Sequence, residues 1–536
     1  MKKLIIILSI LISFSNYVFS QNINIEWQNC FGGSKDDYAT DIIEFENNYF
    51  IVGGSVSNDG DISFNHGKGD GWVIYTDNYG SMIWEKTFGG SRGEYWMRII
   101  PAPDNHFYLL GSSYSSDGDI SNDPYPESTD YWIVKIDSSG NILWDRIIGG
   151  NMLDQMWTGT STFDGGVLAY GWTGSEDGDV SVYYGAYDAW MVKFNSEGEK
   201  EWDFSIGTSG MDVGQAIIQT SDGGYLVGGS SRINDGGNLT CEPHSFKAEA
   251  ILVKLDSNRN IEWQQCYGGS DNDGVTALTE VSDGYIFAGY VNSNDGDISG
   301  WHGENDIWVV KIDFYGNIIW QKCLGGSRSE FVSKLIITDE EEIIIPGITQ
   351  SNDGDVVGNH TLSEHDFDIW IVKLSSDGEL LSQQCIGGGG DENLEFGVVK
   401  KSDNNYVIAG QTNYGPSFDV ECTPHAGTST NYPDFWVFEI EDTTTNIINN
   451  ITKEKVINVY PNPAQDYVNF EYNLPADKKE VILSVINILG IETARFKITD
   501  KKGIKVWDTK NVKPSIYFYN LSVSGFNKSG KIIITK

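Results

Sequence analysis

Basic residues, proline and histidine are scarce in this 536-residue chain. It has 36 Lys and Arg against 76 Asp and Glu, which gives a formal net charge of −40. So acidic a surface repels phosphate, which excludes nucleic acid as an expected partner. The chain contains no His-Glu-x-x-His sequence and no phosphate-binding loop, so neither a zincin-type protease nor a P-loop enzyme is indicated.

Apolar runs long enough to span a bilayer are also lacking, and this predicts a protein with no transmembrane segment. The first 20 residues have a different character. Lys2 and Lys3 precede the short apolar run Leu4–Phe14, and the small residues Val18 and Ser20 follow it. This pattern predicts a signal peptide at residues 1–20, cleaved before Gln21. Because no Cys follows the run, a lipoprotein anchor is not expected.

Glycine and aromatic residues are abundant, and they recur in a repeated motif. Each copy begins with Trp and ends in Gly-Gly-Ser or a close variant, and the copies follow one another every 57 to 61 residues. They are Trp27–Ser34, Trp84–Ser91, Trp144–Asn151, Trp202–Ser209, Trp263–Ser270, Trp320–Ser327 and a seventh that begins at Leu381. A period of this length built from strands is typical of a β-propeller.

The sequence of one repeat is sufficient to predict the strands that each repeat forms. Four short runs of strand-forming residues, at Tyr38–Phe45, Tyr49–Val56, Gly71–Thr76 and Ser81–Phe88, are separated by turn residues. Four strands in about 60 residues is the size of a propeller blade. Twelve of the 17 Trp fall at one position of the third strand or one of the fourth. We therefore interpret them as packing between blades rather than as a ligand cage.

The strand count also predicts how the ring closes. The first motif, around Asn24–Cys30, corresponds to a fourth strand that is not preceded by three others. The seventh repeat, Gly397–Glu441, has three strands and lacks a fourth. The N-terminal strand should therefore complete the last blade and leave no open sheet edge there. The sequence predicts an all-β protein in which residues 21–441 form a seven-bladed β-propeller.

The C-terminal part has a different composition. Residues 442–454 are polar and rich in Thr and Asn, as expected of a linker. From Lys453 to the end there are 14 Lys and Arg and 8 Asp and Glu, a net charge of +6, so the rest of the chain carries −46. Strands are expected at Val459–Phe470, Val481–Ile488, Ile491–Ile498, Ile516–Leu521 and Gly530–Thr535. These predict a small antiparallel β-sandwich domain over residues 455–536.

Short motifs in this domain carry a resemblance. They are Val459 to Ala464 with Tyr460, Pro461, Asn462 and Pro463, then Val485 to Gly490, then Ile516 to Phe518 with Tyr517, and finally Gly530 to Ile533. Together they resemble the C-terminal sorting domain of type IX secretion substrates, although Ser515 stands where that family usually has Gly. The resemblance implies a Bacteroidetes-type bacterium, handling by the type IX machinery, and release or attachment at the outer-membrane surface.

The loop between the second and third strands repeats Asp-Gly-Asp in most copies. The pairs that agree best are Asp59/Asp61, Asp295/Asp297 and Asp353/Asp355. Alternating carboxylates are candidate Ca²⁺ ligands, since this hard cation prefers oxygen, but the 12-residue loop ending in Glu is absent. The alternative is a repeated turn in which Asp accepts backbone hydrogen bonds and Gly adopts the left-handed conformation. No other cofactor is indicated.

Histidines and cysteines recur in the same loops. His66, His302 and His360 each lie seven residues after the first Asp of their loop, a regularity that favours loop packing over catalysis. Cys241 and Cys422 occupy second-to-third-strand loops, and the same repeats hold Cys266 and Cys30 in a fourth strand. An exported protein can keep disulfides, so Cys241–Cys266 and Cys30–Cys422 are candidate pairs, with buried free thiols as the alternative.

Two classes of function remain open. A secreted or surface-displayed binding protein, which holds a glycan, a protein or matrix on a loop-rich propeller face, is favoured because the face is rigid and carries many loops, and because no His-Glu-x-x-His sequence or phosphate-binding loop occurs. The alternative is a secreted polysaccharide hydrolase or lyase with an acidic site on that face. Uniform blades favour binding, whereas a cluster of unrepeated polar residues near the centre would favour an enzyme.

Overall fold

The structure, a computed structural model, describes two compact units, Met1–Asp442 and Thr443–Lys536. It describes residues 23–233, 236–402, 404–425, 432–442, 457–460, 464–473, 481–487, 491–498, 500–510, 512–523 and 526–535. The signal peptide predicted at residues 1–20 lies outside them. So does the predicted linker after Asp442, which is the last residue of a strand.

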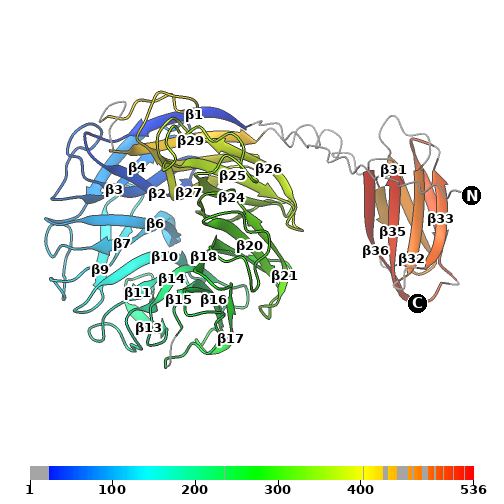
Figure 1. The fold of residues 1–536 in the computed structure, drawn as a ribbon, viewed down its shortest axis with the longest axis horizontal. Coiled ribbons are helices and arrows are strands. Elements are labelled where there is room, and N and C mark those ends of the chain that lie inside the picture. The colour runs from blue at the N-terminus through cyan, green and yellow to red at the C-terminus, as the bar shows by residue number, and fades with distance from the viewer. Residues whose placement is uncertain are drawn as a thin grey trace, which may run out of the picture. The chain divides into compact units, whose positions relative to one another are not determined.

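The described residues of the first unit form seven antiparallel sheets, which follow one another around a ring (Figure 1). We number the sheets by chain order of their first strand. Sheet 1 is β2 (Asp37–Phe45), β3 (Asn48–Ser55), β4 (Asp70–Thr76) and β5 (Met82–Phe88). Sheet 2 is β6 (Glu94–Ala102), β7 (His106–Ser113), β8 (Asp130–Ile136) and β9 (Ile142–Ile148), with the 3-10 helix η1 (Pro103–Asn105) between its first two strands. Sheet 3 is β10 (Asp154–Ser161), β11 (Val167–Thr173), β12 (Asp188–Phe194) and β13 (Lys200–Ile206).

The other four sheets repeat this order. Sheet 4 is β14 (Asp212–Gln219), β15 (Tyr225–Ser231), β16 (Glu249–Leu255) and β17 (Ile261–Tyr267). Sheet 5 is β18 (Asp273–Val281), β19 (Gly284–Val291), β20 (Asp306–Ile312) and β21 (Ile318–Leu324). Sheet 6 is β22 (Glu330–Val332), β23 (Ile336–Ile337), β24 (Ile343–Thr349), β25 (Asp368–Leu374) and β26 (Leu380–Ile386). Sheet 7 is β27 (Glu392–Lys400), β28 (Asn405–Thr412), β29 (Asp434–Asp442) and β1 (Ile23–Phe31).

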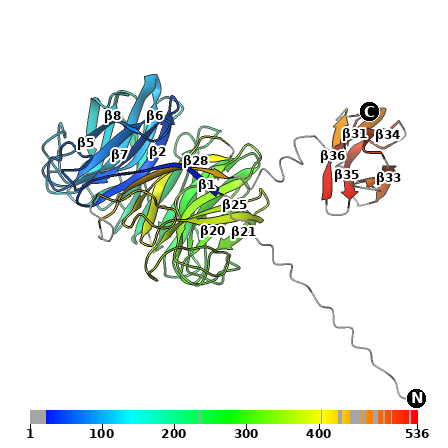
Figure 2. The same cartoon turned by 90° about the horizontal axis from the view of Figure 1, so that it is seen from above.

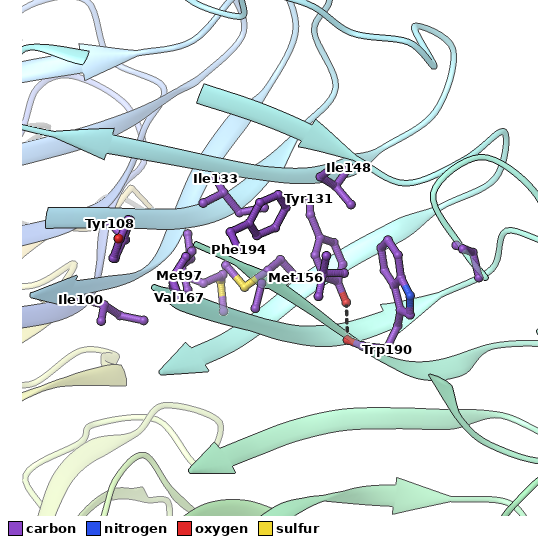
Figure 3. Close-up of a cluster of buried hydrophobic side chains, with 14 residues drawn as sticks. Met97, Ile100, Tyr108, Tyr131, Ile133, Ile148, Met156, Val167, Trp190 and Phe194 are labelled. Atoms are coloured by element: carbon purple, nitrogen blue, oxygen red, sulfur yellow. Dashed lines mark hydrogen bonds between the residues drawn. The ribbon is translucent and has the colours of Figure 1, made fainter. Parts of the chain in front are cut away.

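Seven hydrophobic clusters lie at the seams, by which we mean the packing boundaries between consecutive sheets. Figure 3 shows the cluster between sheets 2 and 3, where Tyr131 of β8 packs on Trp190 of β12 with ring centroids 5.1 Å apart. The Tyr131 hydroxyl donates to the backbone oxygen of Trp190 at 3.2 Å. The third-strand Trp side chains are fully buried at these seams, as the aromatic repeat indicates.

The fourth-strand Trp side chains also contact the next sheet, but nearer the outside of the ring. Trp144 Nε1 donates to the backbone oxygen of Ser196 at 3.2 Å, and Trp320 Nε1 donates to that of Ser376 at 3.2 Å. These contacts lie at third-to-fourth-strand turns, where glycines have positive φ angles. Any side chain on Gly198 would collide with the Trp144 ring, so this turn requires glycine for both backbone angle and space.

The two ends of the first unit meet in sheet 7. β1 pairs antiparallel with β29, with Cys30 opposite Trp436 and Phe31 opposite Phe435. Figures 1 and 2 show β1, in blue, beside the last strands of the same unit. Trp27 and Phe31 belong to the cluster at the seam with sheet 1, while Ile25 and Cys30 pack at the seam with sheet 6. One N-terminal strand therefore contributes to two seams.

The described residues of the second unit form a three-stranded and a four-stranded sheet. The first has the order β30 (Ile457–Tyr460), β31 (Tyr467–Asn473), β34 (Lys502–Asp508), and the second β33 (Glu492–Ile498), β32 (Val481–Asn487), β35 (Ser515–Val523), β36 (Phe526–Ile534). Residues of both sheets, among them Phe470, Trp507, Leu483 and Leu521, share one buried cluster. β34 was not expected, and the strand expected at Val459–Phe470 is two strands, β30 and β31.

Candidate ligand-binding site

The loops between second and third strands and the connectors between sheets meet on one face of the ring, which we call the Asp-Gly-Asp face. In sheet 1, the Ser34 N–H donates to Asp59 Oδ1 at 2.7 Å and the Gly32 N–H donates to Asp61 Oδ2 at 3.1 Å. Gly60 between them has a φ of 67° and lies against the backbone oxygen of Gly32. We call this arrangement the rim clasp.

The rim clasp contains all three carboxylate pairs that the sequence singled out for Ca²⁺. Asp295 and Asp353 accept from Ser270 and Ser327, each at 2.7 Å, and Asp297 accepts from Gly268 at 3.3 Å. The Asp355 N–H donates to the backbone oxygen of Gly325 at 2.8 Å. The backbone hydrogen bond from Ser34 and a further one from its side chain lower the pKa of Asp59. Among the described residues, no group of three or more His, Cys, Asp or Glu side chains is placed to hold a metal ion.

Rim-clasp variants separate hydrogen bonding from Ca²⁺ binding. Asp59→Asn keeps an acceptor oxygen for Ser34, so we expect its Tm within about 1 °C of the wild type. Asp59→Ala removes the acceptor and should lower the Tm by roughly 1–3 °C. Neither shift should depend on excess chelator or millimolar calcium in thermal melts. A wild-type Tm that falls on chelation, together with an insensitive Asp59→Asn variant, would establish Ca²⁺ binding instead.

Histidines extend the rim clasp from one sheet to the next. His66 Nδ1 lies 2.5 Å from Asp70 of its own sheet, and its Nε2 lies 3.4 Å from Asp119 of sheet 2. Four more bridges have the same form: His244 with Glu249 and Asp297, His302 with Asp306 and Asp355, His360 with Asp368 and Asp419, and His425 with Asp434 and Asp61. The hydrogen bond to Asp368 raises the pKa of His360. The loop-packing interpretation of His66, His302 and His360 agrees with these contacts.

The cysteines lie on the same face. The structure joins Cys30 of β1 to Cys422 and Cys241 to Cys266 of β17, and each bond links a loop to the outer strand of its own sheet. Cys323 and Cys385 are free and buried. Burial raises the pKa of the Cys323 thiol to about 12, so this thiol is unreactive at neutral pH.

The inner strands share an irregularity that places side chains in the centre of the ring. In β2, β6, β10, β14 and β18 the pairing register shifts after the third residue, so that the fourth is bulged. The bulged residues are Thr40, Met97, Trp157, Gln215 and Thr276. Bulges redirect a side chain and often lie beside functional sites. The bulged position also differs from sheet to sheet, whereas the first residue of each strand is always Asp or Glu.

Four of the bulged residues line a central cavity of about 340 Å³, which we call the channel cavity. Met97, Trp157, Gln215 and Thr276 contribute to its wall, together with Tyr290 and Phe331. Its volume is within the range of small-molecule sites, and its wall combines aromatic faces with amides and hydroxyls. Gln215 Oε1 is buried and accepts no hydrogen bond from the described residues.

A second cavity of about 270 Å³ adjoins the first, since Thr276 and Ser333 line both. Its charged lining residues are Asp41, Arg98 and Lys334. Lys334 Nζ lies 3.3 Å from Asp41 Oδ1, and Arg98 Nε donates to Thr158 Oγ1 at 3.2 Å. The carboxylate of Asp41 is therefore already engaged by a cation.

Sequence reasoning placed the site on the loops and missed the residues of the channel cavity. One signal was available in the sequence. The residue type at the fourth position of each first strand varies from repeat to repeat, whereas the first position is always Asp or Glu. A bulge adds one residue and so interrupts a period-two pattern, but strands buried on both faces have no such pattern for it to interrupt.

The predicted sorting-motif residues are only partly described. Tyr460 ends β30, and Tyr517 of β35 is buried, with its hydroxyl donating to the backbone oxygen of Lys513 at 2.9 Å. Pro461, Asn462, Pro463 and Gly490 lie outside the described residues. Residues 458–535 match the family model of the secretion system C-terminal sorting domain. The chain thus ends in a type IX sorting domain, and the protein is secreted or attached to the outer-membrane surface.

Similarity elsewhere in the chain is distant. A stretch of 350 residues is 21% identical to the regulatory protein FlaEY of Caulobacter vibrioides and covers 59% of this chain and 36% of that protein. The structure of Drosophila Plexin A in complex with Semaphorin 1b is 8% identical, with a TM-score of 0.39 over 78% of this chain and 87% of that one. The PQQ-bound aldose sugar dehydrogenase of Streptomyces coelicolor is 11% identical, with a TM-score of 0.34 over 78% and 98%. Within the described residues, no helix has the length and apolar character of a bilayer span.

Proposed function

We propose that the first unit is a seven-bladed propeller that binds a glycan in its channel cavity, and that the sorting domain delivers it to the outside of the cell. Aromatic side chains such as Trp157 and Phe331 offer flat apolar faces to the C–H faces of sugar rings. The amide of Gln215 and the hydroxyl of Thr276 offer partners for sugar hydroxyls.

The observation that carries the proposal is the buried amide oxygen of Gln215. A buried acceptor left without a partner destabilises a protein by about 1–3 kcal/mol, so a water molecule or a ligand is expected to satisfy it. A ligand hydroxyl that donates to this oxygen would remove the penalty. Because the penalty exists only in the free protein, it favours binding of a ligand with a hydrogen-bond donor at this point.

Glycoside hydrolysis is less well supported by the side chains that line the two cavities. The common mechanism uses two carboxyl groups on opposite sides of the bond that is cleaved. The described side chains lining the two cavities include one carboxylate, Asp41, which is paired with Lys334. Among the bulged residues that line the channel cavity, those that differ between sheets are Met97, Trp157 and Gln215, which supply contact and hydrogen bonding rather than acid–base chemistry.

Binding of a protein or of matrix is the second candidate function, and it rests on exposed apolar side chains of the Asp-Gly-Asp face. Phe246 is 97% exposed, Leu362 71% and Phe418 62%. Exposed apolar side chains mark an interaction surface where they form a contiguous patch. A ligand that uses them would contact the loops and leave the channel cavity unchanged.

A screen of the mature protein against oligosaccharides and polysaccharides tests the proposal, with reaction products checked by mass. We expect at least one glycan to bind without being cleaved. Trp157→Ala should weaken that binding roughly 10- to 100-fold. The sugar ring would lose the aromatic face on which it packs, and its hydroxyls would no longer be held against their hydrogen-bond partners.

The matched control is Trp172→Ala, since Trp172 lies in the same sheet but packs edge-on against Tyr187, with ring centroids 4.6 Å apart, and does not line the channel cavity. Equal loss of binding in both variants would point to general destabilisation. Cleaved products would replace the binding function with the hydrolase or lyase alternative.

A further inference from the structure

Two seams bring buried carboxyl groups together without a histidine. Asp154 begins β10 and faces Asp130, which begins β8 of the preceding sheet, and Asp212 of β14 faces Asp188 of β12 in the same way. All four side chains belong to residues at most 2% exposed. Asp130 Oδ1 and Asp188 Oδ1 are buried and accept no hydrogen bond from the described residues.

The groups around both pairs are acidic or neutral. Asp123, Tyr125 and Ser128 face Asp130, while Tyr131 and Tyr183 face Asp154. Tyr183 and Tyr184 face Asp188, and Tyr170 faces Asp212. None of the four carboxylates has a Lys, Arg or His nitrogen of the described residues within 4.0 Å. In five other seams, the corresponding third-strand carboxylate contacts a histidine.

A connector glycine lies beside each pair of carboxyl groups. A side chain on Gly149 would collide with both Asp130 Oδ1 and Asp154 Oδ2, and one on Gly207 would collide with Asp188 Oδ1 and approach Asp212 Oδ2 to 3.0 Å. The Gly150 N–H donates to Asp154 at 2.8 Å, and the Thr208 N–H donates to Asp212 at 2.7 Å. At these seams, as elsewhere among the described residues, no group of three or more His, Cys, Asp or Glu side chains is placed to hold a metal ion.

We propose that each of these two seams holds a proton shared between its paired carboxyl groups at neutral pH, and that raised pH releases it and loosens the ring at sheet 3. The proton comes from water and lies between the otherwise unpartnered Oδ1 of the third-strand Asp and the facing carboxylate. Two buried carboxylates of like charge that face each other repel, and one proton shared between them removes the repulsion.

The direction of the pH dependence follows from burial. Burial raises the pKa of Asp130 to about 8 and that of Asp188 to about 7, and it also raises those of Asp154 and Asp212. An Asp side chain in the unfolded chain has a pKa of about 3.9. Between this pH and the higher pKa values of the folded protein, the folded protein keeps protons that the unfolded chain has lost. The seams therefore stabilise the fold fully at low pH, and this contribution is lost as pH rises through about 7 to 8.

The seams bear on the channel cavity through chain connectivity. Asp154 lies three residues before Trp157 in β10, and Asp212 lies three residues before Gln215 in β14. Hydrogen bonds from Ser175 and Thr208 fix the two aspartates at the start of those strands. Release of the protons should therefore loosen the strands that carry two cavity residues.

Asp130→Asn tests the proposal in the full chain, because an amide reproduces the neutral, protonated carboxyl group. We expect its Tm to exceed that of the wild type by roughly 2–4 °C at about pH 8.5 and to equal or fall below it at about pH 5. The difference in Tm between variant and wild type should rise steadily across that range.

Asp177→Asn is the control, because Asp177 belongs to the rim clasp of sheet 3 and the hydrogen bond from Asn151 lowers its pKa. Its Tm difference from the wild type should be constant between about pH 5 and 8.5. A constant or falling difference for Asp130→Asn would overturn the proposal.

Infrared spectroscopy provides a readout that does not depend on variant folding. The wild-type protein in D₂O should show the carbonyl band of protonated carboxyl groups at neutral pH, and that band should disappear as pH rises to about 9. Absence of the band at neutral pH would contradict shared protons even if Asp130→Asn did not fold.

Discussion

Deletion of residues 23–31 is expected to abolish cooperative unfolding of the ring. β1 is hydrogen-bonded to β29 along its length, and its side chains enter two seams. Trp27 Nε1 donates to Glu439 at 2.8 Å, and Trp436 Nε1 donates to Gln28 at 3.0 Å. Loss of the strand exposes the edge of β29 and removes apolar contacts that stabilise the fold by about 1.5–3 kcal/mol for each large side chain.

Differential scanning calorimetry and near-UV circular dichroism measure this effect. The variant should lack a sharp transition, and because an uncovered strand edge pairs with other chains it should aggregate. A cooperative transition within a few degrees of the wild type would show that the ring does not depend on β1. Since the deletion also removes Cys30, the proper control is the double variant Cys30→Ser/Cys422→Ser, which should still unfold cooperatively.

The two disulfides are expected to differ in their contribution to stability. Cys30 and Cys422 are separated by 392 residues, and Cys241 and Cys266 by 25. In the chain-entropy description, a crosslink restricts the unfolded chain more when it closes a longer loop, which gives about 6 kcal/mol for the first bond and about 3.5 kcal/mol for the second. The double variant Cys30→Ser/Cys422→Ser should therefore be the less stable of the two by about 2.5 kcal/mol.

Denaturant unfolding of the oxidised proteins measures the difference between the two double variants. Equal midpoints, or a lower midpoint for Cys241→Ser/Cys266→Ser, would contradict the account. Cys323 and Cys385 serve as internal probes, because both are buried and should react with an alkylating agent only after unfolding.

The all-β fold and the sorting domain were predicted from the sequence because many residues together form the repeats and motifs that indicate them. The strand expected at Gly71–Thr76 is β4 (Asp70–Thr76), since a run of apolar residues flanked by turn residues leaves few alternatives. β34 (Lys502–Asp508) was missed because its seven residues include two lysines, a glycine and an aspartate, so its composition is close to that of a loop.

The candidate site was less predictable. His244 and His425 make the same bridges as His66, but their loops are longer and the spacing to the Asp-Gly-Asp position is lost. The seam pairs join residues of different sheets, such as Asp130 and Asp154, and only the folded ring shows that they meet. Trp157 appeared as one more aromatic residue, although its bulge directs it to the channel cavity.

Hydrogen–deuterium exchange of the protein with and without a bound glycan tests the channel cavity most directly. Binding there should slow exchange in β10 (Asp154–Ser161) and β14 (Asp212–Gln219), whose bulges carry Trp157 and Gln215, and leave the rim loops around Asp59 and Asp353 unchanged. Slower exchange confined to the rim loops, with β10 and β14 unaffected, would contradict the account and place the ligand on the loop face.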